Sequence, residues 1–315
     1  MEKIRLGIST CLLGENVRFD GGHKLDRYLT DTLGHYVEYL PVCPEVECGL
    51  GTPREPLRLV GDRENPRLIT SRSNKDQTDR MMGWAETRVA QLEKEDLCGF
   101  IFKSGSPSSG MERVKVYGLN GVPAKVGVGL FARIFRDHFP LLPVEDEGRL
   151  HDPILRENFI ERIFALRRWR DVLKEKKSLK NLIDFHTRNK LLLLAHSPEH
   201  YRQMGRRVAG GKEIPLPELF SQYQILFLEA LGLKATNRKN SNVLMHMLGY
   251  FKDRLSGNEK QEMLDIIEQY RLEILPLIVP ITLLKHYVRK YDEPYLKEQT
   301  YLNPHPGELQ LRNHV

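Results

Sequence analysis

The chain changes its sequence pattern at Asp152-Pro153, and this change constrains the fold more than any other feature. Before it, short apolar runs alternate with segments whose apolar residues recur at helical spacing; after it, every periodic segment is helical. Alternating strand and helix signals are typical of βαβ units and a mostly parallel sheet. At 315 residues the chain also exceeds the roughly 250–300 residues at which a single core stops growing. We therefore predict an α/β domain over residues 1–150 and an all-α domain over residues 151–315.

Three apolar runs in the first domain predict buried strands: Ile4 to Ser9, Val37 to Val42 and Cys98 to Phe102. Each run leads directly into a loop that contains a cysteine or a glycine- and serine-rich turn. In open α/β sheets, ligands bind beyond the carboxyl ends of the strands. We therefore expect Cys11, Cys43 and the turn over residues 103–113 to meet at one edge of the sheet.

The remaining elements follow from periodicity and helix-end signals. In the first domain, helices are predicted over residues 24–33, 76–95 and 127–139, with Asp76 as an N-cap, and a last strand over 141–144. Pro153 at a first helical position begins a long helix that ends near Lys177. Further helices are predicted over residues 179–196, 197–209, 217–231, 241–255, 256–271 and 276–291, followed by an extended tail, 301–315, that packs along a helix.

Composition places the chain among ordinary globular proteins, with 40% hydrophobic and 29% charged residues. Without an apolar run near the roughly 20 residues of a membrane span, and without a signal peptide, it is expected to be cytoplasmic and away from membranes. Four cysteines in a chain of this length do not form a disulfide framework. All four lie in the first hundred residues and three fall in loops, which favours metal binding or chemistry.

Thiolates on separate strand-end loops can hold an iron–sulfur cluster. A cluster bound by four thiolates is saturated, whereas one bound by three keeps an iron that can take a substrate atom. Spacing alone does not decide between such a site and cysteines that merely fill space, because long gaps occur in any chain.

Three segments carry a resemblance to a known family: STCLLGENVRFDGG, VCPEVECGLGTPREP and KSGSPSSGMERVKVYG. Residues 1–145 resemble the thiouracil desulfidase family. The resemblance implies a Rossmann-like domain with a 4Fe-4S cluster on three cysteines, whose fourth iron binds the sulfur of a thiolated pyrimidine. Matched residue by residue, Cys11 and Cys43 fall on two of those ligands. The third family cysteine corresponds to Ser109 in the motif Ser-Pro-Ser-Ser-Gly.

Ser109 departs from the family pattern. A hydroxyl is harder and far less acidic than a thiol and is a poor ligand for such a cluster. One explanation is a cysteine-to-serine substitution that inactivates the protein, which we favour because the motif around Ser109 is intact. The other is a natural variant in which Cys48, five residues beyond Cys43, replaces the missing ligand.

Glu45 and Ser106 are the candidates for proton transfer. Removing sulfur from C4 of a thiopyrimidine needs a base to activate water and a donor for the leaving group, and a carboxylate and a hydroxyl suit these roles. Glu45 directly follows the Cys43-Pro44 pair, which would place its carboxylate beside a metal. Alternatively, Glu45 caps a turn or pairs with Arg54.

The helical half is basic. Residues 1–165 carry a net charge of −2 and residues 166–315 one of +8, which suggests either a polyanion-binding surface or a merely solvated one. The stretches LIDFHTRNKLLLLAHS, NRKNSNVLMHMLGYFK and YLNPHPGELQLRN resemble a second family, described only as being of unknown function. When a domain of this second family is fused to a desulfidase domain, the resemblance implies a tRNA 4-thiouridine desulfidase whose helical part holds the tRNA. The residues that we expect to contact RNA are His186, Lys190, Arg238, Lys239, Asn242, His246 and Lys252.

The sequence thus predicts an enzyme that converts 4-thiouridine in tRNA to uridine, with Ser109 putting the activity of this chain in doubt. Two alternatives remain open. The first is a desulfidase of free thiouracil or thionucleosides, in which the helices serve dimerisation or stability. The second is an RNA-binding or partner-binding module with a degenerate metal site.

Overall fold

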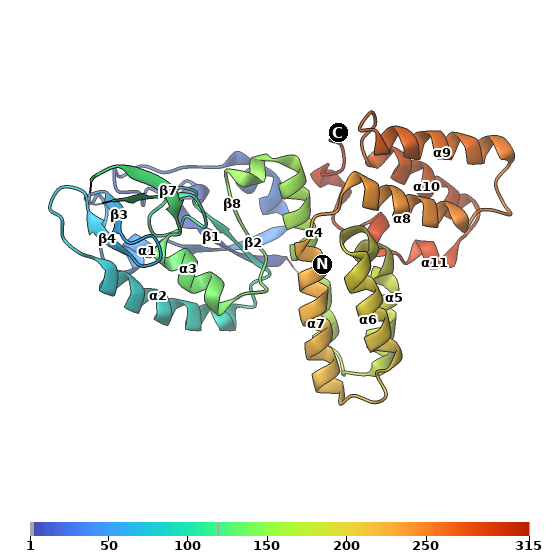
Figure 1. The fold of residues 1–315 in the computed structure, drawn as a ribbon, viewed down its shortest axis with the longest axis horizontal. Helices are drawn as coiled ribbons and strands as arrows, with labels where there is room; N and C mark the ends of the chain where they lie inside the picture. Colours follow the sequence, from blue (N-terminus) through green and yellow to red (C-terminus); the bar gives the residue numbers. More distant parts are fainter. Residues whose placement is uncertain (1–2, 119, 315) are drawn as a thin grey trace. The chain divides into compact units, whose positions relative to one another are not determined.

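The computed structural model describes residues 3–118 and 120–314, which form two compact units that separate between Asp152 and Pro153 (Figure 1). The first unit is α/β with an all-parallel sheet, and the second is helical. The fold class predicted from the sequence is therefore confirmed. Among the helices described, none has the length and apolar character that crossing a membrane requires.

The first sheet contains β1 (Ile4–Ser9), β2 (Val37–Val42), β5 (Gly99–Phe102) and β8 (Val144–Asp146). Their order is β2-β1-β5-β8 and all pairs are parallel. The first three strands lie where the apolar runs predict them. The fourth begins three residues later than predicted, directly after Pro143, which has no N–H group to donate to a neighbouring strand.

Helices α2 (Thr78–Leu92) and α3 (Leu130–His138) lie side by side (Figure 1) and pack against the first sheet. The core between them is aromatic: the rings of Phe100 and Phe135 are 4.7 Å apart, and Phe102 and Phe131 complete the cluster. Gly7 on β1 makes room for this cluster, because a Cβ there would lie 2.2 Å from Cδ2 of Phe100.

A second sheet was not among the predicted elements. It contains β3 (Leu57–Gly61), β4 (Pro66–Thr70), β6 (Val114–Tyr117) and β7 (Pro123–Gly127), in the order β4-β3-β6-β7. Strands β3 and β6 are parallel, whereas the outer pairs are antiparallel. One face packs through Leu59, Leu68, Val114 and Val116 against Met81 of α2. The prolines, glycines and arginines around these short strands mask their alternating pattern.

The three helices predicted in the first unit all begin later than expected, including α3, which begins at Leu130 and not at residue 127. Over residues 24–33 there is instead a π-turn, η2 (Tyr28–Thr32), followed by the 3₁₀ turn η3 (Leu33–His35), because the Asp26 carboxylate accepts the N–H of Leu29 at 3.1 Å. The helix predicted from Asp76 begins at Thr78, whose N–H donates to the Asp76 carboxylate at 2.8 Å. The other short turns of this unit are η1 (Thr10–Leu13), α1 (Pro44–Glu47), η4 (Glu93–Glu95) and η5 (Arg149–His151).

The second unit contains every helix that the periodicity predicts. These are α4 (Pro153–Lys174), α5 (Leu179–His196), α6 (Pro198–Ala209), α7 (Leu216–Gly232), α8 (Asn237–Gly249), α9 (Gly257–Arg271) and α10 (Ile278–Lys290), with the short α11 (Pro294–Lys297) in addition. Helix α8 begins four residues early because the Thr236 hydroxyl caps the N–H of Lys239 at 3.3 Å. The tail contains two 3₁₀ turns, η6 (Thr300–Leu302) and η7 (Gly307–Leu309), and packs on α4 through Arg312. Val315 lies outside the described residues.

Candidate active site

A cavity of about 330 Å³ lies at the carboxyl ends of β1, β2 and β5. Parallel strands end at the same edge of a sheet, so the loops that follow them meet there. The structure brings five of the candidate residues together in the lining of this cavity: Cys11, Cys43, Glu45, Ser106 and Ser109.

Both cavity cysteines are free thiols in buried positions. Cys11 lies in the turn after β1, and Cys43 lies at the start of α1, where its N–H donates to the Glu47 carboxylate at 2.9 Å. Burial raises the pKa of Cys11 to about 11 and that of Cys43 to about 12. Both are therefore protonated near neutral pH, and binding a metal would have to release their protons.

The Glu45 carboxylate lines the cavity and contacts three neighbouring side chains. Its Oε2 lies 3.7 Å from the Cys43 sulfur and 3.7 Å from Nη2 of Arg54. Its Oε1 accepts a hydrogen bond of 3.4 Å from the Ser106 hydroxyl. The ion pair with Arg54 that the sequence left as an alternative therefore exists, and it fixes the carboxylate beside a cavity thiol.

Ser106 organises the loop that carries Ser109. Its hydroxyl oxygen accepts the N–H groups of Ser108 and Ser109 at 3.2 and 3.1 Å, and its carbonyl accepts the N–H of Gly110 at 2.8 Å. Ser109 is only 3% exposed, and it lines the cavity. The side chain that the sequence resemblance matches to a third cysteine is thus a buried hydroxyl on a turn held by backbone hydrogen bonds.

Helix α3 supports this turn from behind. The N–H of Gly129 donates to the carbonyl of Gly110 at 2.7 Å, and that of Ala132 donates to the carbonyl of Ser108 at 3.1 Å. A Cβ on Gly129 would lie 2.4 Å from the Ser108 carbonyl oxygen and 2.8 Å from the Ser109 nitrogen. Glycine is therefore required at 129 for the close approach of two backbone segments.

We predict that Gly129→Ala displaces the 106–110 turn and destabilises the first unit by about 1–3 kcal/mol, the usual cost of overpacking. Gly83→Ala is the matched control, because a Cβ on that helical glycine meets nothing within 4 Å and alanine favours the helix. Urea unfolding of both variants checks the prediction. Equal midpoints for Gly129→Ala and the unsubstituted protein would contradict it.

Lys103 lines the cavity and forms an ion pair with Glu147, a residue that the sequence did not single out. Glu147 directly follows β8, and its carboxylate accepts hydrogen bonds of 2.7 Å from the N–H and the hydroxyl of Ser104. The same carboxylate pairs with the ammonium of Lys103, which lines the cavity. The strand-end rule that located Cys11 and Cys43 would also have located Glu147, had β8 been placed correctly.

Cys48 lies in a different environment. It is buried in the core of the second sheet against residues such as Leu59 and Met81, and its thiol donates to the carbonyl of Glu45 at 3.3 Å. The cysteines among the described cavity-lining residues are Cys11 and Cys43. The geometry therefore does not favour Cys48 as a replacement ligand. Cys98 is buried in the core, as its place in an apolar run suggests.

The RNA-binding candidates divide between two surfaces. His186 and Lys190 line an open groove of about 810 Å³ formed by α5 and α6, together with the cations Arg202, Arg206 and Lys212. His186 is 3% exposed, and its Nδ1 lies 3.2 Å from the Tyr223 hydroxyl. Burial lowers the pKa of His186 to about 4, so it adds no positive charge to the groove at neutral pH.

The other candidates lie on α8 or directly after it. Arg238, Asn242 and His246 are exposed at four-residue intervals on one side of that helix. Lys239 is directed elsewhere, because its ammonium donates to the carbonyls of His196 and Lys234 at 2.7 and 3.0 Å. Lys252 is exposed in the turn after α8.

The two aromatic residues beside Lys252 have different surroundings. Phe251 is buried, as expected for a core residue. Tyr250 is 44% exposed and stacks on Tyr295, with 5.2 Å between the ring centroids. Of the two rings, that of Tyr250 is the one accessible from solvent.

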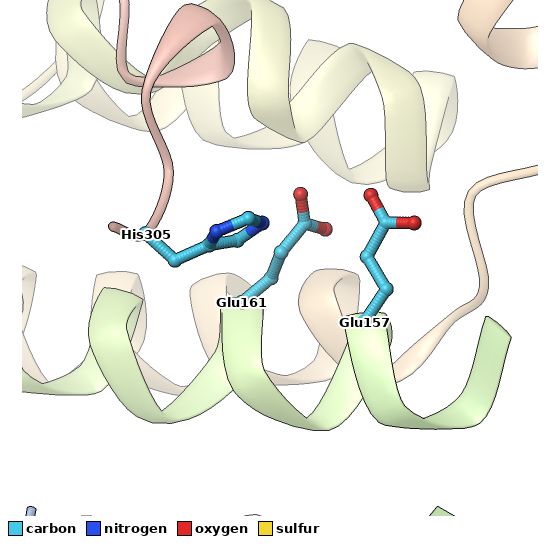
Figure 2. Close-up of side chains that lie close together, drawn as sticks. All are labelled: Glu157, Glu161 and His305. Atoms are coloured by element: carbon cyan, nitrogen blue, oxygen red, sulfur yellow. The ribbon is translucent and has the colours of Figure 1, made fainter. Parts of the chain in front are cut away.

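Glu157, Glu161 and His305 form a cluster in the second unit, shown in Figure 2, in which Glu161 is buried and the other two are partly buried; their possible ligand atoms lie within 4.8 Å of one another. Arg312 already supplies a cation there, with Nε 3.1 Å from Glu157 and Nη2 2.7 Å from Glu161. Burial and the neighbouring Glu161 raise the pKa of Glu157, which leaves about one negative charge on the pair. A divalent cation would therefore meet a charge that is already balanced, and the cluster is a structural ion pair.

Two family models match the chain. Residues 6–147 match the model described as 2-thiouracil desulfurase, and residues 190–306 match the model described as a protein of unknown function (DUF1722). The first match spans the whole candidate active site. The N-terminal unit is therefore a domain of the thiouracil desulfurase type.

Individual proteins are similar to parts of this chain. The uncharacterized protein YbgA of Escherichia coli (strain K12) is 34% identical over 153 residues, which cover 48% of this chain and 90% of YbgA. The uncharacterized protein YbbK of Bacillus subtilis (strain 168) is 29% identical over 108 residues, 33% of this chain and 71% of YbbK. A solved structure described as a 4Fe-4S-dependent thiouracil desulfidase, TudS, is 31% identical and covers 48% of this chain and 95% of its own, with a TM-score of 0.40. With 34% identity over nine-tenths of YbgA, the chain belongs to the YbgA family.

The donors around the cavity do not complete a three-thiolate set. The described lining offers two thiols, Cys11 and Cys43, and the hydroxyl of Ser109. Because a serine hydroxyl is a poor ligand for an iron–sulfur cluster, the residues of this chain do not fit a cluster held by three cysteines.

Proposed function

We propose that this chain is a member of a tRNA 4-thiouridine desulfidase lineage, and that Ser109 keeps its desulfidation activity low or absent. The observation that carries the proposal is the cavity at the ends of β1, β2 and β5, where two thiols, the Glu45 carboxylate and the hydroxyls of Ser106 and Ser109 converge. Its volume of about 330 Å³ lies at the small end of ligand pockets and suits a single pyrimidine ring.

The reaction is a hydrolysis in which water adds to C4, the carbon–sulfur bond breaks, and the sulfur leaves as hydrogen sulfide. The carboxylate of Glu45 would accept a proton from the water. Ser106, hydrogen-bonded to that carboxylate, would pass a proton on to the leaving sulfur or the ring. Arg54 would keep the carboxylate oriented through its contact of 3.7 Å.

The tRNA part of the proposal draws support from the basic second unit. Residues 166–315 carry a net charge of +8, and the α5–α6 groove gathers four cations, Lys190, Arg202, Arg206 and Lys212. Such patches neutralise phosphates and bind RNA in a salt-dependent way. A second candidate function, an RNA-binding module without catalysis, is favoured by one observation: the cavity has the hydroxyl of Ser109 where the resemblance implies a cysteine.

A substrate comparison tests the proposal. The Ser109→Cys protein, reconstituted anaerobically with iron and sulfide, would be offered 4-thiouridine in tRNA and free 2-thiouracil. We expect the thiocarbonyl absorbance of the tRNA to disappear and the free base to react little. Turnover of the free base alone would contradict the tRNA assignment, and tRNA binding without any turnover would favour the binding module.

In the same background, we predict that Glu45→Gln lowers turnover about 10²- to 10⁴-fold, the usual contribution of a general base. Glu64→Gln, a change on an 83%-exposed side chain, is the matched control. Single-turnover desulfidation and urea unfolding would be measured together. If Glu45→Gln keeps its turnover within about threefold, Glu45 serves only as the structural partner of Arg54.

A further inference from the structure

Three cationic side chains stand next to one another across the second sheet. The register of β6 and β7 pairs Lys115 directly with Lys125. The register of β3 and β6 pairs Leu59 with Val116, which places Arg58 beside Lys115. Neighbouring strands are about 4.8 Å apart and paired residues point to the same face, so the three cations form a row.

This row lies on the face of the sheet that is turned away from the core. Residues of the opposite face, including Leu59, Val114 and Val116, are buried, whereas Lys115 and Lys125 are exposed. Like charges directly opposite each other on neighbouring strands are destabilising. We therefore expect that an anionic ligand bound at this row would relieve the repulsion between the paired cations and stabilise the sheet.

The row has little counter-charge of its own. Neither Lys115 nor Lys125 has an ion pair with any residue in the described part of the chain. Arg58 donates to the side chain of Asn74 at 3.0 Å, but its Nε is buried without a hydrogen-bond partner. The Glu55 carboxylate, on a nearby loop, is occupied by the backbone and hydroxyl of Ser73 at 2.7 Å.

Two members of the row, Arg58 and Lys115, lie beside the candidate active site. A second cavity, of about 300 Å³, is lined by Arg58, Lys115 and Tyr117. Pro56, Leu57, Gly105 and Pro107 line both this cavity and the active-site cavity, so the two cavities are neighbours. The Tyr117 ring is partly exposed, with the Arg58 guanidinium carbon 5.6 Å from its centroid.

We propose that Arg58, Lys115, Lys125 and Tyr117 form a flanking-nucleotide site, which binds the phosphates and the base next to the thiolated nucleotide. The inference rests on the proposed function and adds that the first unit itself binds the nucleotides on either side of the thiolated one. Lysine and arginine bind phosphate oxygens, and an aromatic ring stacks on an unpaired base of any sequence. A free base would fill the active-site cavity and leave the flanking-nucleotide site empty.

The test compares a trinucleotide that has 4-thiouridine in the middle with the free nucleoside 4-thiouridine. Binding to the unsubstituted 315-residue chain is measured over a range of salt concentrations, so that the result does not depend on turnover. The variants are Lys115→Gln/Lys125→Gln, Tyr117→Leu and the control Lys94→Gln, which changes an exposed lysine of the same unit.

We expect the double variant to bind the trinucleotide about tenfold more weakly than the unsubstituted chain does, with nucleoside binding unchanged. The slope of log affinity against log salt concentration should fall by about 1.4, which is about 0.7 for each lost phosphate contact. Tyr117→Leu should weaken trinucleotide binding without changing the salt slope. Lys94→Gln should match the native chain.

The inference is overturned if the double variant binds the trinucleotide as the native chain does, or no worse than Lys94→Gln. It is also overturned if a short acidic peptide competes as well as the trinucleotide, because that would indicate a protein partner. Failure of the proposed function is separate: the Ser109→Cys protein would then remove sulfur from no thiolated substrate, whatever the binding results.

Discussion

Ser109→Cys is expected to bind an iron–sulfur cluster that the native chain holds weakly or not at all. Position 109 lines the same cavity as Cys11 and Cys43, so the substitution would complete a set of three thiols. Losing even an outer partner of a metal ligand costs about 10- to 100-fold in affinity, and losing a ligand should cost at least as much. Iron and sulfide content after anaerobic reconstitution, together with the visible absorbance, measures the gain.

Ser108→Cys is the matched control. Ser108 is buried next to Ser109 on the same turn, but it is not one of the described residues that line the cavity. A cysteine at 108 should therefore add no ligand. If the native chain bound as much iron as Ser109→Cys, or if both variants gained equally, position 109 would not be the third ligand position.

Arg312→Met is expected to destabilise the second unit by about 3–5 kcal/mol, because it leaves buried carboxyl groups without their cation. Arg312 is 5% exposed and contacts Glu161 at 2.7 Å, Glu157 at 3.1 Å and the carbonyl of Tyr301 at 2.7 Å. Urea unfolding of the second unit would measure the loss. The exposed pair of Arg271 and Glu268 is the control, and Arg271→Met should leave the urea midpoint nearly unchanged.

The effect of Arg312→Met should depend on pH. Burial alone would raise the pKa of Glu161, but the hydrogen bond from His196 and the charge of Arg312 hold it below its usual range. A carboxyl with a lowered pKa contributes stability above its unfolded value and loses it as the pH falls. The difference between native and variant proteins should therefore be largest near neutral pH and shrink below about pH 4.5. A triple variant with Glu157→Gln and Glu161→Gln should recover part of the loss, and a loss no larger than that of Arg271→Met would contradict the prediction.

The sequence predicts the parts of this fold that depend on local patterns. Apolar runs located β1, β2 and β5, and helical spacing located α4 to α10, because a buried face leaves a periodic trace in the sequence. The positions of Cys11 and Cys43 followed from the rule that parallel strands present their loops at one edge. The resemblance added Ser109, Glu45 and Ser106.

What the sequence did not predict depends on contacts between distant segments. The second sheet consists of four short strands in which Arg58, Lys115 and Lys125 come from different segments, and their register cannot be read from any one of them. The burial of Cys48 in that sheet's core, which removes it from the cavity, follows from the same missing pairing. The sequence predicts Lys239 as an RNA contact like its neighbours on α8, but its ammonium donates to the carbonyls of His196 and Lys234, which lie outside that helix.

The turn over residues 106–110 owes its shape to the Ser106 hydroxyl and to backbone bonds with α3. Within the described part of the chain, the Ser109 side chain contributes none of the hydrogen bonds that hold this turn. The side chain at 109 can therefore be exchanged without refolding its surroundings. Serine and cysteine differ by one atom, so a lineage could lose a metal ligand here and regain it by a single substitution, with the rest of the pocket preserved.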